Sequence, residues 1–167
     1  MFLNTIIETK IYQGFELKNM IPQSYKPIYE TSLKMIIDKP IFGIGSKMFR
    51  ESCNKEIYFI DGGCSTHPHN TYLQLLAETG IIGTIPIFFV FFYILYQYIN
   101  HISVYILKNK ILIQNNKLLF MSSIFISLFP FLPSLNFFHN WYSIMTFLPI
   151  GFLLHSITND NLPKNLK

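Results

Sequence analysis

The stretch CSTHPHNTYLQLLAETGIIG at residues 64–83 places a polar, histidine-containing segment directly before a long apolar run. Pro68 has a φ fixed near the helical value and no N–H to leave unpaired, which suits the first position of a helix. Thr66 or His67 would then cap this helix, and Gly80 would supply the left-handed residue that ends it. We therefore predict a short helix with His69 in its first turn.

His69 and Asn70 both fall in that predicted first turn. Free backbone N–H groups and the positive end of the helix dipole favour a bound anion, such as a phosphate, at this position. A neutral histidine beside a phosphate can act as a general base. The plainer interpretations are that His69 is an interfacial hydrogen-bonding group and that Asn70 orients it.

The composition becomes strongly apolar after this stretch. Half of the chain is hydrophobic, 17% is aromatic and only 13% is charged, a balance typical of membrane proteins. Three runs are apolar and long enough to predict transmembrane helices, at about residues 81–100, 118–133 and 141–157. The lysines are scattered and the chain has a single arginine, so nucleic acid is not expected as a partner.

The segment before residue 64 is more polar and predicts shorter elements. Residues 1–25 are compatible with an amphipathic interfacial helix, the end of a longer element or a partly ordered arm. Apolar side chains at helical spacing predict an amphipathic helix at residues 28–38, which stops before Pro40. Gly43 and Gly45 then permit a tight loop, and residues 47–56 are polar enough for a short helix in water.

The distribution of charge predicts the orientation of the three spans. Lysines in the 108–117 loop and in the tail, set against one aspartate, hold the whole net charge of +4, and the charges before Gly80 cancel. By the positive-inside rule the loop and the C-terminal tail, 158–167, are cytoplasmic. Residues 1–80 and the turn at 133–140 are then extracytoplasmic, with 81–157 forming the membrane part.

Cys53 and Cys64 would lie in an oxidising compartment in this orientation. A disulfide between them is the first interpretation, and it would pin the loop that carries His67 and His69. Zinc bound by the two cysteines and two histidines is the rival, although their spacing does not match the usual zinc motifs. Two free thiols are the third possibility. No metal or cofactor is expected.

Two sequence blocks carry a resemblance to a known family. His69-Asn70, followed after nine residues by Gly80 and then by Gly83, resembles the signature of the O-antigen ligase and polymerase superfamily. That superfamily contains lipopolysaccharide O-antigen ligases, O-antigen polymerases and bacterial protein oligosaccharyltransferases. Upstream, PIFGIG at residues 40–45 with Phe49 resembles the block that precedes the histidine motif. The resemblance extends in outline from about Lys26 to about Phe152.

The resemblance implies an all-α integral membrane protein, part of a polytopic glycosyltransferase-C-like fold. The chain resembles the C-terminal portion of such proteins, with about three transmembrane helices and a periplasmic helical loop region, in the bacterial inner membrane. The remaining helices would come from a longer gene product or another chain. The implied activity transfers a glycan from an undecaprenyl-pyrophosphate donor to an acceptor hydroxyl, with lipid A-core as the first choice of acceptor.

Several other functions remain open at this point. Within the superfamily, an O-antigen polymerase or a protein oligosaccharyltransferase fits the same motif. Outside it, the chain could be an inactive fragment or a non-catalytic membrane subunit. A transporter is disfavoured, because the three predicted spans contain no Asp, Glu, Lys or Arg.

The resemblance also implies roles for individual residues. His69 would be the catalytic base. Arg50, Lys26, Asn70 and His67 would bind the pyrophosphate or the glycan, since a guanidinium can hold phosphate oxygens in two-pronged fashion. Lys26 stands close to a position where relatives often have an arginine. Arg50 could instead be a solvated charge beside Glu51, and His67 could serve the helix cap.

Overall fold

The computed structural model describes residues 23–161, and this part of the chain consists of helices and loops with no strand. Its helices are, in chain order, α2 (Lys26–Asp38), α3 (Phe49–Ser52), α4 (Thr71–Lys108), α5 (Asn115–Ser127) and α6 (Asn140–Asn161). The all-α prediction is confirmed for these residues, as is the helix predicted at 28–38. The segment before residue 23, which holds most of the predicted arm, and the last six residues of the tail lie outside the described range.

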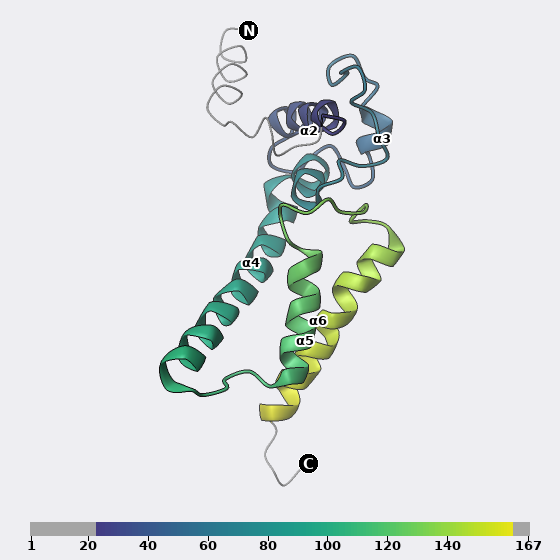
Figure 1. Cartoon of the computed structure of the whole chain (residues 1–167). Coiled ribbons are helices and arrows are strands. Elements are labelled where there is room, and N and C mark those ends of the chain that lie inside the picture. Colours follow the sequence, from purple (N-terminus) through teal and green to yellow (C-terminus); the bar gives the residue numbers. More distant parts are fainter. Residues whose placement is uncertain (1–22, 162–167) are drawn as a thin grey trace.

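The three helices on the C-terminal side, α4, α5 and α6, form a bundle, and α2 and α3 lie together at one end of it (Figure 1). The connection between α5 and α6, residues 128–139, returns to the same end as α2 and α3 (Figure 1). The connection between α4 and α5 lies at the opposite end, as does the last turn of α6. The molecule thus has a head, residues 23–82 with 128–139, and a helical bundle made of the rest of α4 with α5 and α6.

Apolar side chains from all three helices of the bundle form its core. Phe91 and Ile94 of α4, Met121 and Ile124 of α5 and Leu153 of α6 are buried in this core. Partly buried aromatic rings extend it, and the rings of Phe91 and Phe125 stack with centroids 5.3 Å apart. α2 packs against the first part of α4 over a smaller apolar cluster that includes Met35 and Ala77.

Two helices, α4 and α6, are long and apolar enough to cross a membrane. Of the most apolar 18-residue segment of each helix, only 33% in α4 and 11% in α6 is buried inside the molecule. The core helix of a soluble protein would be mostly buried, so these outward apolar faces fit a lipid environment better.

The second predicted span, 118–133, is helical only over its first part. α5 has 13 residues and ends at Ser127. A helix of that length rises about 20 Å, less than the roughly 30 Å of a hydrocarbon core. Pro130 ends the helix early because it disfavours helical backbone at the residue before it. Two tyrosine hydroxyls donate hydrogen bonds to carbonyl oxygens at the end of α5. Tyr72 donates to the carbonyl of Leu128 at 2.9 Å, and Tyr142 donates to that of Ser127.

The backbone of α4 is broken at Gly80, which has φ +65° and ψ −165°. The prediction of a left-handed glycine at this position is therefore confirmed. The predicted helix end is only half right, because the helix resumes immediately and runs on to Lys108. A short helix and the first apolar span are consequently one kinked element of 38 residues.

The loop at residues 40–45 fills the break in α4, and we call this contact with residues 77–82 the glycine junction. Four backbone hydrogen bonds form it: Ile44 N to Ala77 O (2.9 Å), Gly45 N to Glu78 O (2.9 Å), Ile81 N to Pro40 O (2.9 Å) and Ile82 N to Ile41 O (3.3 Å). These bonds satisfy the N–H and carbonyl groups that the break releases. A Cβ on Gly80 would lie 2.3 Å from the Ile41 oxygen, so the backbones touch.

Candidate functional site

The histidine loop, residues 64–70, is tied to α3 by a disulfide. Cys53 directly follows α3 and Cys64 begins the loop, and their Cα atoms are 5.3 Å apart across the bond. The same helix carries Arg50. Within residues 23–161, no group of three or more His, Cys, Asp or Glu side chains is arranged to hold a metal ion. The disulfide therefore brings one candidate cation and the two candidate histidines into one part of the head.

His67 is buried and both of its ring nitrogens are hydrogen-bonded. Nε2 lies 3.1 Å from the carbonyl oxygen of Ser134, which can only accept, so Nε2 carries the proton. Nδ1 then accepts from the hydroxyl of Thr66 at 2.9 Å. Burial lowers the pKa of His67, and the nearby His69 adds to this effect against the opposing Ser134 bond. The neutral ring is thus bound on both sides by its own chain.

His69 is held differently from His67. Its backbone has φ +57°, in the left-handed region that residues other than glycine rarely adopt. Its Nε2 lies 3.1 Å from the Ser65 hydroxyl, and its ring packs against those of Tyr25 and His67 with centroids 5.2 and 4.2 Å away. The side chain is half-buried. No hydrogen bond from another described residue reaches its Nδ1.

The predicted start of the helix is wrong. Asn70 is the N-cap of α4, and its Oδ1 accepts the backbone N–H groups of the second and third helical residues at 3.0 and 3.1 Å. Asparagine is among the best N-cap residues, and here it prevails over the preference of proline for the first helical turn. Pro68 is instead buried in the loop. Neither Thr66 nor His67 caps the helix, and His69 precedes it.

The 128–139 connection packs directly on the histidine loop. Asn70 Nδ2 donates to the carbonyl of Pro130 at 2.7 Å, and Ser134 N donates to the carbonyl of His69 at 3.0 Å. Pro130 and Ser134 make the contacts to the loop, whereas the side chains of His139 and Trp141 are exposed.

The two candidate cations are both exposed. Arg50 lies in α3 and forms no ion pair with another side chain of the described range. Lys26 begins α2 and lies 3.9 Å from Glu30 in a solvent-exposed pair of small energetic value. The ring of Tyr25 contacts that of His69, so the start of α2 is beside the histidine loop. The elements that carry the two cations therefore adjoin this loop, α3 through the disulfide and α2 through Tyr25.

Three residues that contact the histidine rings were not predicted: Tyr25, Ser65 and Ser134. Ser65 is a near neighbour of His69 in a tight loop, so its hydroxyl could have been considered from the sequence. Tyr25 and Ser134 are brought in by tertiary packing from distant parts of the chain. No local pattern indicates either contact.

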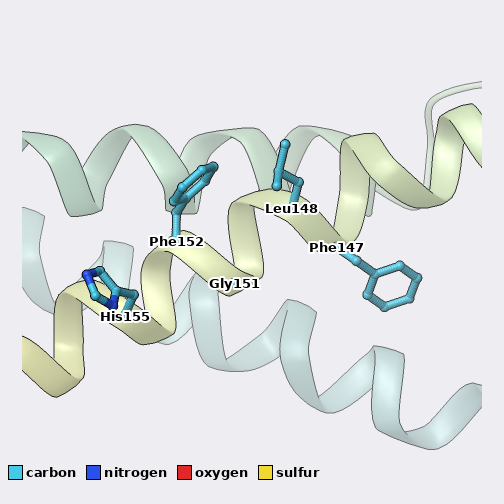
Figure 2. Close-up of a pocket in the computed structure, with 5 residues that line it drawn as sticks. All are labelled: Phe147, Leu148, Gly151, Phe152 and His155. Carbon is cyan, nitrogen blue, oxygen red and sulfur yellow. The ribbon is translucent and has the colours of Figure 1, made fainter.

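A separate hollow lies midway along α6 (Figure 2). Figure 2 shows Phe147, Leu148, Phe152 and His155 projecting from the helix around Gly151. A Cβ added to Gly151 would meet nothing within 4 Å. Its lining is apolar apart from one histidine, so it lacks the convergent polar groups of a polar-substrate site.

Comparison with known proteins gives one match. A family model described as O-antigen ligase matches residues 8–90, a range that contains the glycine junction and the histidine loop. No curated protein and no solved structure matches the chain.

Proposed function

Because the chain belongs to the O-antigen ligase family, we propose that it contributes the transfer site of a membrane glycosyltransferase. The donor is a glycan linked to undecaprenyl pyrophosphate, and the acceptor is a hydroxyl group of lipid A-core. The family supports a role in O-antigen biosynthesis at a membrane, and the outward apolar faces of α4 and α6 agree with such a location.

The proposed catalytic base is His69. The observation that supports this choice is the contrast between the two histidines, since only His69 keeps a ring nitrogen uncommitted to another described residue. When Nε2–H donates to Ser65, Nδ1 holds the lone pair and can take the proton of the acceptor hydroxyl. The hydroxyl oxygen then attacks the anomeric carbon, and the bond from that carbon to the pyrophosphate oxygen breaks.

The leaving group in this scheme is undecaprenyl pyrophosphate, which gains negative charge as the bond breaks. We assign its stabilisation to Arg50 and Lys26, the exposed cations on α3 and α2. His67 and Asn70 support the site by holding the loop, because their polar atoms are bonded to Thr66, Ser134, Pro130 and the start of α4.

The proposed topology places residues 1–80 and the turn at 133–140 in the periplasm and the 158–167 tail in the cytoplasm. Two observations support this topology: the charge pattern, and the position of α2, α3 and the 128–139 connection at the same end of the bundle (Figure 1). A single cysteine introduced at Lys55 should react with a membrane-impermeant maleimide while the inner membrane is intact. One introduced at Lys110 should react only after the inner membrane is permeabilised. Labelling of the first position only after permeabilisation of the inner membrane would overturn the proposal.

The test of the activity is a substitution at His69. Membranes containing the chain in its native gene context are given lipid-linked glycan and, separately, lipid A-core, a second lipid-linked repeat or an acceptor protein. His69→Ala should lower transfer by about 10²-fold or more, the usual contribution of a general base. His139→Ala, at an exposed histidine of the same head, should behave as wild type.

Equal transfer by His69→Ala and wild type would contradict the catalytic role of His69. Transfer only to a lipid-linked repeat or only to protein would replace lipid A-core as the acceptor. Absence of transfer to all three acceptors would contradict the catalytic proposal itself.

A further inference from the structure

Glu78 is a buried carboxyl group of α4, at the contact between α4 and the start of α3. It is 1% exposed and lies two residues before the break in α4. Its two oxygens accept three hydrogen bonds, from Lys47 N (3.0 Å), Phe49 N (3.0 Å) and Gln74 Nε2 (3.2 Å). Burial of a carboxyl group is costly unless it is bonded in this way, so these contacts determine what the residue does.

The first pair of contacts fixes the start of α3. Met48, the N-cap residue of α3, makes no side-chain capping bond, and the Glu78 carboxyl supplies the acceptor from a different helix. Lys47 has φ +63°, a conformation that its bond to Glu78 helps to hold. Arg50 is the second residue of α3. The position of Arg50 therefore depends on Glu78 through the backbone of its own helix.

The hydrogen bond from Gln74 links Glu78 to the 128–139 connection. Gln74 is fully buried, one helical turn before Glu78, and its Nε2 also donates to Asn136 Oδ1 at 2.8 Å. Its Oε1 accepts the backbone N–H of Phe137 at 2.9 Å. The same connection carries Ser134, which hydrogen-bonds to both residues of the candidate histidine pair. Two groups of hydrogen bonds, connected through the backbone of residues 134–137, thus join Glu78 to the histidine loop.

We propose that Glu78 is a positioning residue that, together with Gln74, holds Arg50 in a fixed place relative to the histidine loop. The inference rests on the proposed function, because it takes Arg50 as a ligand of the pyrophosphate group. Glu78 itself does not touch the substrate. It sets the geometry in which a polyprenyl pyrophosphate ester bridges the cation and the base.

The test is a double-mutant cycle on pyrophosphate binding. The affinity of the full chain in lipid nanodiscs for undecaprenyl pyrophosphate is measured for wild type, Glu78→Ala, Arg50→Ala and the double variant. Each single variant should bind about tenfold more weakly, the usual effect of a lost charge-assisted hydrogen bond. The double variant should bind no more weakly than Arg50→Ala, because Glu78 acts through Arg50.

Two further variants serve as controls. Glu78→Gln keeps the side-chain length and one oxygen acceptor, so its affinity should lie between wild type and Glu78→Ala, and it replaces Glu78→Ala if that variant fails to fold. Thr146→Val removes another fully buried polar group, bonded only within α6, and should bind as wild type.

The outcomes separate this inference from the proposed function. Equal affinity of the Glu78 variants and wild type would overturn the inference alone. Losses that add in the double variant would mean that Glu78 acts independently of Arg50, which would also overturn it. Failure of wild type to bind undecaprenyl pyrophosphate would overturn the proposed function and this inference with it.

Discussion

The head and the bundle are stabilised by different kinds of contact. In the bundle, apolar side chains such as Phe91 and Ile124 pack between helices. In the head, the backbone is joined by the hydrogen bonds of the glycine junction, by the Cys53–Cys64 disulfide and by side-chain caps. A side chain in the bundle can be exchanged for another of similar size, whereas the head depends on individual backbone atoms. The polar residues of the site all belong to the more demanding region.

The largest expected effect comes from breaking the glycine junction. Gly80→Ala puts a Cβ 2.3 Å from the Ile41 oxygen at a residue with φ +65°. Strain and overlap together should cost roughly 3 kcal/mol or more of stability. Thermal unfolding in detergent measures the loss.

Gly151→Ala is the matched control in the bundle. A Cβ at Gly151 meets nothing within 4 Å, and the position is helical. Alanine should therefore stabilise α6 by roughly 0.5–1 kcal/mol. If both alanine variants unfold at the same temperature, the contrast between head and bundle is wrong.

The disulfide should give the next largest effect. Reduction opens a short loop, with 11 residues of separation, and should destabilise the head by about 2–3 kcal/mol. Hydrogen exchange should rise in α3 and the histidine loop and stay unchanged in α5. The Cys53→Ala/Cys64→Ala variant should exchange like the reduced protein and should not respond to reductant. Faster exchange throughout the bundle would show that the two regions unfold as one unit.

The smallest expected effect is a pH dependence confined to the head. Burial lowers the pKa of His67 below its ordinary 6.5, so the folded state favours the neutral ring. This contribution to stability is complete above the unfolded pKa and is lost as the pH falls through the folded one. Unfolding temperature should decline on acidification from about pH 8 to about pH 5.

His67→Gln removes the titrating group while keeping an N–H donor for Ser134. Its unfolding temperature should depend less on pH than that of wild type. An identical dependence in the two proteins would assign the effect to another group.

Local rules predicted the elements that local chemistry controls. The helix at 28–38 and its end before Pro40 followed from apolar spacing, and a left-handed Gly80 followed from the freedom of glycine. The start of α4 was misplaced because two local signals competed, and the cap formed by Asn70 prevailed over Pro68. Nothing in the local pattern indicated that loop 40–45 would bond to the backbone on both sides of Gly80 and so allow the helix to continue.

The site was predictable only in part, for the same reason. The two histidines and Arg50 stand out by residue type, and the fold gathers their elements at one end of the bundle (Figure 1). The partners that distinguish His67 from His69 are Ser134 and Ser65, and Ser134 comes from a connection about seventy residues away in sequence. Pairings of such separation leave no periodicity or motif.

The short length of α5 bears on how deep its C-terminal end would lie in the bilayer. If its lysine-flanked start lies at one surface of the bilayer, its last turn stops roughly 10 Å short of the other, inside hydrocarbon. Carbonyl oxygens at a helix end normally accept hydrogen bonds from water, but here the hydroxyls of Tyr72 and Tyr142 donate to them. This end of α5 can therefore lie within the hydrocarbon region, and the proposed lipid-linked donor would reach the histidine loop without leaving its leaflet.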